Sequence, residues 1–126
     1  MANRIFVSVQ EGILEPEWLA AAQKFIETAA GALNFDGEEI SVLFCSDEYI
    51  KELNKSYRNI DAPTDVLSFE NDETYEDEEG KWKCVGDIAI SLDTLPVNAE
   101  YFNEDANTEL KRLLVHGLLQ IGRAHV

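Results

Sequence analysis

The sequence contains few cysteines, few prolines and few cations. Its two cysteines, Cys45 and Cys84, each lie in or beside an apolar, strand-like run. Their separation does not match zinc-ligand spacing, and two cysteines do not make a disulfide framework. We therefore expect both to be buried, reduced thiols.

Long hydrophobic runs are also missing, and the first residues do not match the pattern of a leader sequence. No apolar run approaches the ~20 residues that a membrane-spanning helix needs. The first residues, MANRIFVSVQEG, lack the basic start and apolar stretch of a signal peptide. We therefore expect a cytoplasmic protein with no membrane partner. The length of 126 residues predicts one domain, residues 1–126.

Positive charge is scarce. Ten Lys and Arg residues stand against 25 Asp and Glu residues, for a formal net charge of −15. Nucleic-acid-binding proteins usually have a basic surface, because neutralised phosphates supply much of their affinity. RNA would therefore have to meet a local basic cleft or be delivered by a partner. Seven of the acids lie in ENDETYEDEE, residues 70–79, which we expect to form a solvated loop.

Hydrophobic periodicity predicts alternating strands and helices. Strands are expected at residues 3–9, 39–45, 65–70 and 83–91, and helices from Pro16 to about Leu33, after an N-cap at Ser46 to about Tyr57, from Leu92 onward, and from Asn107 or Thr108. The last two strands have no helix between them, which indicates an antiparallel hairpin with a long tip. The order β-α-β-α-β-β-α-α predicts a single α+β domain with one four-stranded sheet packed against helices.

The first segment with chemical potential is LNKSYRNIDAPTDVLSF, Leu53 to Phe69. Taken alone, it reads as a helix end, a turn and a strand. Arg58 is then a cation favoured by the helix dipole, and Asp61 and Thr64 are turn residues.

The second segment is GDIAIS, which begins at Gly86. The glycine favours a bulge or a close backbone approach. Asp87 would satisfy neighbouring amides, so a structural role is the simplest interpretation.

The third segment is ELKRLLVHGLL, Glu109 to Leu119. A lone histidine on a leucine-rich helix is most often a hydrogen-bonded core or edge residue. Gly117 costs about 1 kcal/mol in a helix relative to alanine, which indicates close backbone approach there. A second metal ligand would lie four residues after His116 on the same face, but that position holds Gln120, a poor zinc ligand.

Taken together, the three segments resemble the YbeY family of metal-dependent endoribonucleases of rRNA maturation. That family typically shows N-x-x-Y-R-x-x-D-x-P-T-D-V-L-S-F, then G-D-I, then H-G-x-L-H-L-x-G-Y-D-H. This chain has NKSYRNIDAPTDVLSF from Asn54, GDI at Gly86 and HGLL from His116. Order and approximate spacing agree too, so the resemblance covers residues 3–119.

The resemblance implies roles for individual residues. His116 matches the first metal ligand, Gln120 stands at the second ligand histidine, and Arg58 matches an arginine implicated in catalysis. His125 falls one residue short of the third ligand position, so it has no clean family counterpart. The implied cofactor is one divalent metal ion, zinc being the best match, and we expect Arg58 and His116 to share one cleft.

The last seven residues, QIGRAHV, depart from the family pattern. One reverse translation of this stretch matches a common sequencing-adapter sequence. We therefore expect residues 120–126 not to be native, and Gln120 to replace a histidine. A chain with this ending is predicted to bind metal weakly and to have little or no nuclease activity.

The implied function is single-strand-specific cleavage of RNA in rRNA maturation and small-subunit quality control. The expected partners are rRNA and the small ribosomal subunit or a ribosomal protein, and DNA is not expected. Lys55 and Arg112 are candidate RNA contacts, beside Arg58 and Lys111 as local cations. Two alternatives stay open: a non-catalytic ribosome-associated binding module, and a zinc peptidase-like hydrolase. The second is disfavoured because Gly117 occupies the place of the glutamate base.

Overall fold

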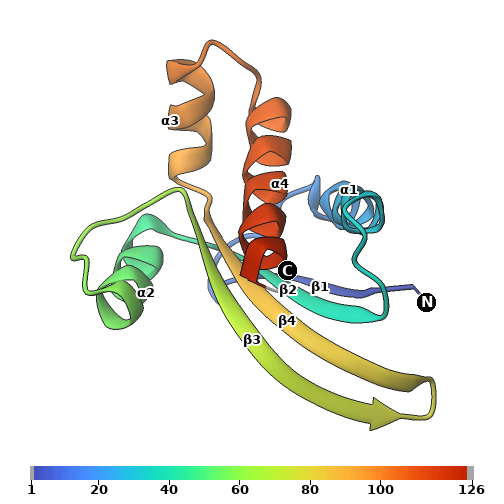
Figure 1. The fold of residues 1–126 in the computed structure, drawn as a ribbon. Helices are drawn as coiled ribbons and strands as arrows, with labels where there is room; N and C mark the ends of the chain where they lie inside the picture. The colour runs from blue at the N-terminus through green and yellow to red at the C-terminus, as the bar shows by residue number, and fades with distance from the viewer. Residues whose placement is uncertain (1, 125–126) are drawn as a thin grey trace.

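The computed structural model describes residues 2–124, so His125 lies outside the described residues. The elements follow one another in the predicted order (Figure 1). They are β1 (Arg4–Val9), α1 (Leu19–Ala32), β2 (Glu38–Cys45), α2 (Asp47–Arg58), β3 (Val66–Asp77), β4 (Gly80–Ser91), α3 (Thr94–Tyr101) and α4 (Ala106–Ala124). The predicted α+β class is confirmed.

The four strands form one mixed sheet in the order β1-β2-β4-β3. β1 pairs with β2 and β2 with β4 in parallel, whereas β3 pairs with β4 antiparallel, as the predicted hairpin requires. Figure 1 shows α1 and α4 on one face of the sheet and α2 on the other. β3 is therefore an edge strand, with α4 on one face of the sheet and α2 on the other.

The main hydrophobic core lies between the sheet and the pair α1 and α4. A smaller cluster holds α2 to the opposite face, around Ile50 and Leu67. Gly117 lets α4 approach the sheet closely: a Cβ at this position would lie 2.9 Å from Cγ2 of Ile88. This contact is the close backbone approach that the helical glycine indicated, and it brings the backbone of α4 against β4.

The acidic run is not a solvated loop. Residues 70–83, here the acidic arm, continue β3 and β4 as a paired ribbon that turns at Gly80, where φ is +132°. Arg4 of β1 holds the arm: its guanidinium lies 2.5 Å from Asp77 and 2.7 Å from Glu79. The same group stacks 3.9 Å from the ring centroid of Trp82. Because one cation from a distant strand offsets several acids, the ribbon pairs despite its charge.

Helix ends differ modestly from the predictions. The cap at Ser46 is confirmed, since its Oγ accepts a hydrogen bond from the Tyr49 amide at 3.1 Å. α1 begins at Leu19 instead of Pro16, because residues before it form a turn. α4 begins at Ala106, just before the two predicted starts, since Asp105 accepts from the Thr108 amide at 2.7 Å.

The two thiols are reduced, as expected, but only Cys45 is fully buried, while Cys84 is half-buried. Loss of hydration raises the pKa of each thiol to about 11, which makes both poor nucleophiles at neutral pH. Among residues 2–124, no helix combines the length and apolar character needed to cross a bilayer.

Candidate functional site at the edge of the sheet

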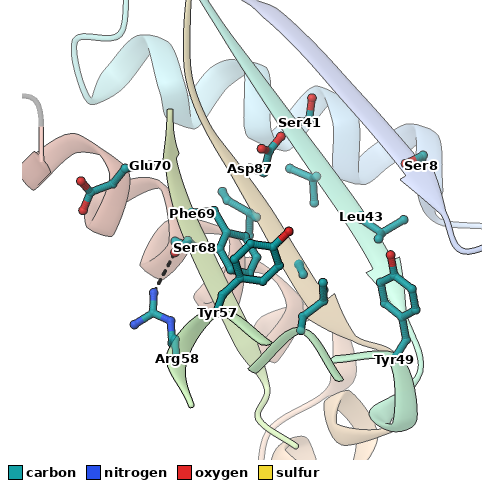
Figure 2. A pocket seen from close by; sticks show the side chains of 14 residues that line it. Ser8, Ser41, Leu43, Tyr49, Tyr57, Arg58, Ser68, Phe69, Glu70 and Asp87 are labelled. Carbon is teal, nitrogen blue, oxygen red and sulfur yellow. Dashed lines mark hydrogen bonds between the residues drawn. The ribbon is translucent and has the colours of Figure 1, made fainter. Parts of the chain in front are cut away.

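Arg58 ends α2 and reaches the edge strand. The helix stops there because Asn59 adopts a left-handed conformation, with φ of 59°. The turn that follows folds back under the helix, since buried Asn54 donates to the Ala62 carbonyl at 2.9 Å. In this position the Arg58 guanidinium donates to the Ser68 carbonyl on β3 at 2.8 Å (Figure 2).

Ser68 connects this arginine to α4. Its side chain is buried on the α4 face of the sheet, and its hydroxyl donates to the Gly117 carbonyl at 3.3 Å. Gly117 follows His116 directly. A single residue of the edge strand therefore contacts Arg58 through its backbone and the histidine-bearing turn through its side chain.

His116 is an exposed residue of α4, so of the two simpler interpretations the core histidine does not hold and the hydrogen-bonded edge histidine does. Its Nε2 lies 3.0 Å from the amide nitrogen of Gln120, four residues further along the same helix face. This contact places position 120 within reach of whatever His116 binds, as the i to i+4 spacing predicted.

Arg58 and His116 do not line a common hollow within the described part of the chain. Arg58 lines a cleft on the α2 face of the sheet, whereas His116 lines a shallow groove between α4 and Phe25 of α1. The expectation that Arg58 and His116 share one cleft is therefore wrong. The reason is topological: the two residues approach β3 from opposite faces, and a ligand would contact both only by crossing its edge.

The cleft around Arg58 is the larger hollow, with a volume of about 650 Å³. The open face of the sheet forms its floor and α2 forms one wall. We call it the sheet cleft. Figure 2 shows the rings of Tyr57 and Phe69 between Arg58 at one end and Asp87 at the other. Ser41 lies beside Asp87 on the neighbouring strand, consistent with their pairing in the sheet register.

Asp87 has a different role from the one the sequence suggested. Within residues 2–124 its carboxylate takes part in no hydrogen bond or ion pair, so it does not satisfy neighbouring amides. The side chain is exposed to the sheet cleft. Loss of hydration, followed by the negative charges of Glu39 and Glu73, raises the pKa of this carboxyl. An unpaired acid held in a cleft at an electrostatic cost is a mark of a functional group.

The described residues do not make a complete metal site. No group of three or more His, Cys, Asp and Glu side chains within residues 2–124 is arranged to hold a metal ion. His116 supplies one imidazole, and Gln120 supplies an amide, which is a weak donor for zinc. This donor set does not fit the centre that the resemblance implies, in which three histidines hold the metal and one position stays open for water or substrate.

The two other candidate cations differ in availability. Lys55 is exposed and lies 4.0 Å from Asp61. Arg112 makes a two-pronged ion pair with buried Glu109, at 2.6 and 2.7 Å, and lies 3.6 Å from Asp65. The hydrogen bonds from Arg112 lower the pKa of the Glu109 carboxyl. Arg112 therefore holds the start of α4 in place, which leaves it fewer donors for a phosphate.

Comparison with known proteins shows that this chain is similar to proteins named endoribonuclease. The chain is 49% identical over 125 residues to an endoribonuclease of Treponema denticola, covering 96% of this chain and 79% of that protein. It is 37% identical over 119 residues to one of Aquifex aeolicus, covering 94% and 75%. A solution structure of a Thermotoga maritima protein matches with a TM-score of 0.62 at 28% identity, over 94% and 71% of the two chains.

The family follows from the same findings. The family model described as Endoribonuclease YbeY matches residues 6–122. The chain belongs to the YbeY family, and the resemblance drawn from the three segments is confirmed.

Proposed function

We propose that this protein is a single-strand-specific endoribonuclease that acts in rRNA maturation and small-subunit quality control, and that the chain in its present form cleaves RNA slowly or not at all. Membership of an endoribonuclease family supports the first part. The incomplete donor set around His116 supports the second.

The observation that carries the proposal is the placement of Arg58 at the edge of the sheet. Only one of its donors is used by the Ser68 carbonyl. A guanidinium has five N–H donors in a fork that fits phosphate oxygens, so the remaining donors are available for RNA. Arg58 would bind and orient the phosphate and would offset negative charge that develops on it during cleavage.

The cofactor proposed for the family activity is one divalent metal ion, with zinc as the best match. In this chain the described candidate ligands are His116 and Gln120, so we expect it to bind zinc weakly. No step of the reaction is assigned to the metal in this chain, because its described ligands fall short of three histidines.

The proposed partners are rRNA together with the small ribosomal subunit or a ribosomal protein, in the cytoplasm, without DNA or a membrane. The net charge of −15 supports a delivered substrate, because a strongly acidic protein repels a free polyanion. A ribosomal partner would present the RNA at short range, where the few local cations suffice.

The second candidate is a non-catalytic ribosome-associated binding module. The single imidazole of the described site favours it for this chain. A peptidase-like hydrolase is not supported, because Gly117 packs against Ile88 and offers no carboxylate beside His116.

Cleavage of fluorescent single-stranded RNA is compared for the chain and for a Gln120→His, Val126→His double variant, with added zinc or with a chelator. This double variant, here the repaired variant, has three histidines at the family spacing from His116. The comparison separates enzyme from module. Zinc-dependent cuts by the variant, with few by the parent chain, would support the enzyme. Binding without cuts by both proteins at saturating zinc would support the module.

Arg58→Ala, made in the repaired variant, is expected to fold normally and to reduce RNA cleavage by about a hundredfold, as removal of one charge-stabilising donor does elsewhere. Lys51→Ala is the matched control, since Lys51 is an exposed cation of the same helix, 3.9 Å from Asp61. Cleavage retained in Arg58→Ala, or lost equally in both variants, would contradict the role of Arg58.

A further inference from the structure

We propose that the sheet cleft is a binding site for a guanine base of single-stranded RNA, with Asp87 as the residue that selects guanine and Tyr57 as the surface on which the base stacks. This inference rests on the proposed function, since it assumes that the ligand is RNA. It adds a base-binding site to the phosphate contact at Arg58.

The size and shape of the cleft suit one nucleotide. Its volume of about 650 Å³ lies within the range of small-molecule sites, and it opens to solvent along the sheet. Arg58 stands at one end and Asp87 at the other, with the two aromatic rings between them (Figure 2). A nucleotide placed along this line meets a cation, a ring surface and an acid in that order.

Electrostatics orients the ligand along that line. Asp87 lies near Glu39 and Glu73, whose negative charges already disfavour its ionised form. A phosphate would be repelled from this end and attracted to the Arg58 guanidinium at the other end, with an attraction that is reduced by Glu70, which also lines the cleft. The RNA backbone would therefore stay at the edge of the sheet, with the base turned inward.

Tyr57 offers the stacking surface. Its side chain is 71% exposed although it lines the cleft, and its ring contacts Phe69 edge to face, with centroids 5.1 Å apart. Phe69 thus supports one edge of the ring and leaves most of Tyr57 open. Stacking of unpaired bases on aromatic side chains is the usual way in which proteins bind single-stranded RNA, and it does not depend on base identity.

Base identity is then decided by Asp87. Its carboxylate offers only acceptors, and it is unpaired within the described residues. Guanine alone presents two adjacent donors, N1–H and the N2 amino group, that a carboxylate can accept together. Adenine and cytosine each place an acceptor beside their single amino group, and uracil has acceptors on both sides of N3–H. The acid therefore favours guanine and opposes the other three bases.

Fluorescence anisotropy with labelled UUGUU and UUAUU, at low salt and with a chelator present, tests the site without any cleavage. The parent chain is expected to bind UUGUU about tenfold more tightly than UUAUU. The same probe with inosine in place of guanosine lacks the N2 amino group, so its affinity should lie between those of the other two probes. Equal binding of the guanine and adenine probes would overturn the proposal.

Substitutions make the test sharper. Asp87→Asn should reverse the preference toward UUAUU, because an amide donates and accepts side by side as adenine requires. Asp72→Asn removes the same charge from an exposed site on the acidic arm and should leave the preference unchanged. If Asp87→Asn and Asp72→Asn behave alike, Asp87 does not select the base.

Tyr57→Ala should weaken the binding of both probes by about tenfold, because the stacking surface is lost. Tyr101→Ala, at an exposed tyrosine of α3, should weaken the binding of neither probe.

The outcome separates this site from the nuclease proposal. Guanine-selective binding that persists with a chelator, together with no zinc-dependent cleavage by the repaired variant, would support the base-binding site and contradict the nuclease proposal. Cleavage by that variant, with no preference for guanine in binding, would support the nuclease proposal and contradict the base-binding site. If an arginine-rich peptide binds the cleft and neither oligonucleotide does, the cleft is a protein-docking site and the base-binding proposal is wrong.

Discussion

Residue 120 carries an amide where the family resemblance places an imidazole. The contact between Gln120 and His116, at 3.0 Å, shows that a side chain at this position already reaches the exposed histidine ring. The backbone for a two-histidine site is therefore present in α4, and the donor chemistry is what falls short. A substitution at residue 120 can therefore test whether a better metal ligand at this position is enough to raise the affinity for zinc.

Gln120→His is expected to raise the affinity of the chain for zinc by at least about tenfold, because a good nitrogen ligand replaces a poor one on the same helix face. Zinc retained after dialysis, or a competition titration with a chromogenic chelator, measures the change. Asn107→His is the control: it adds the same ring at an exposed position of α4 that lies about two and a half turns before His116, on the opposite side of the helix. Equal affinities of the two variants would contradict the assignment of position 120.

Asp87 is a single residue whose ionised form lowers the stability of the fold. Because loss of hydration raises its pKa in the folded state, the folded protein keeps this proton to a higher pH than the unfolded chain does. The free energy of unfolding therefore falls as pH rises from the unfolded pKa through the folded one. Ionised Asp87 thus destabilises the fold at neutral pH.

Asp87→Asn is accordingly expected to raise the melting temperature at pH 7, with the gain shrinking as pH falls toward the usual pKa of an aspartic acid. Thermal unfolding across this pH range measures the effect. Asp72→Asn, on the exposed acidic arm, removes the same charge and should show a smaller gain. A melting temperature for Asp87→Asn that is unchanged or lower at pH 7 would count against the raised pKa.

At the scale of elements, the acidic arm depends on a residue far from it in sequence. Residues 70–79 of the arm include seven acids, a composition typical of a solvated loop. It is a ribbon because Arg4 of β1 contacts Asp77, Glu79 and Trp82 together. Local composition could not reveal this contact, since the partners are more than seventy residues apart.

Replacing Arg4 by Met, which keeps the aliphatic stem but removes the charge, is expected to loosen the arm while the core stays folded. Trp82 is buried beneath the guanidinium, so its fluorescence should shift to longer wavelength. Amide hydrogen exchange in residues 71–79 should become faster. Lys81→Met, at an exposed lysine of the same arm, should change neither signal. An arm that keeps its protection in Arg4→Met would show that strand pairing alone suffices.

At the scale of the whole molecule, charge limits how RNA can bind. With a net charge of −15, the surface as a whole repels a polyanion, and attraction is confined to a few cations near the edge of the sheet. Of the local cations that the sequence offers, Arg112 is committed to buried Glu109. Arg58 and Lys55, both on α2, are then the main candidates for phosphate contacts.

Affinity for single-stranded RNA should therefore depend on salt only moderately. Two contacted phosphates predict a slope of about −1.4 for the logarithm of the association constant against that of the salt concentration. Anisotropy titrations at several salt concentrations measure the slope, and Arg58→Ala should make it shallower by about 0.7. A slope steeper than about −4 would indicate an extended basic surface that the described residues do not provide.

The sequence by itself determined the order of strands and helices, the cap at Ser46 and the family. These features depend on local patterns, because hydrophobic spacing and turn chemistry act between residues close together in the chain. Only the tertiary structure decided that the acidic run pairs as a ribbon, that Asp87 stands unpaired in a cleft, and that Arg58 and His116 approach β3 from opposite faces. Each of these depends on contacts between distant segments, and such contacts come from the stacking of layers around the sheet, which no local pattern specifies.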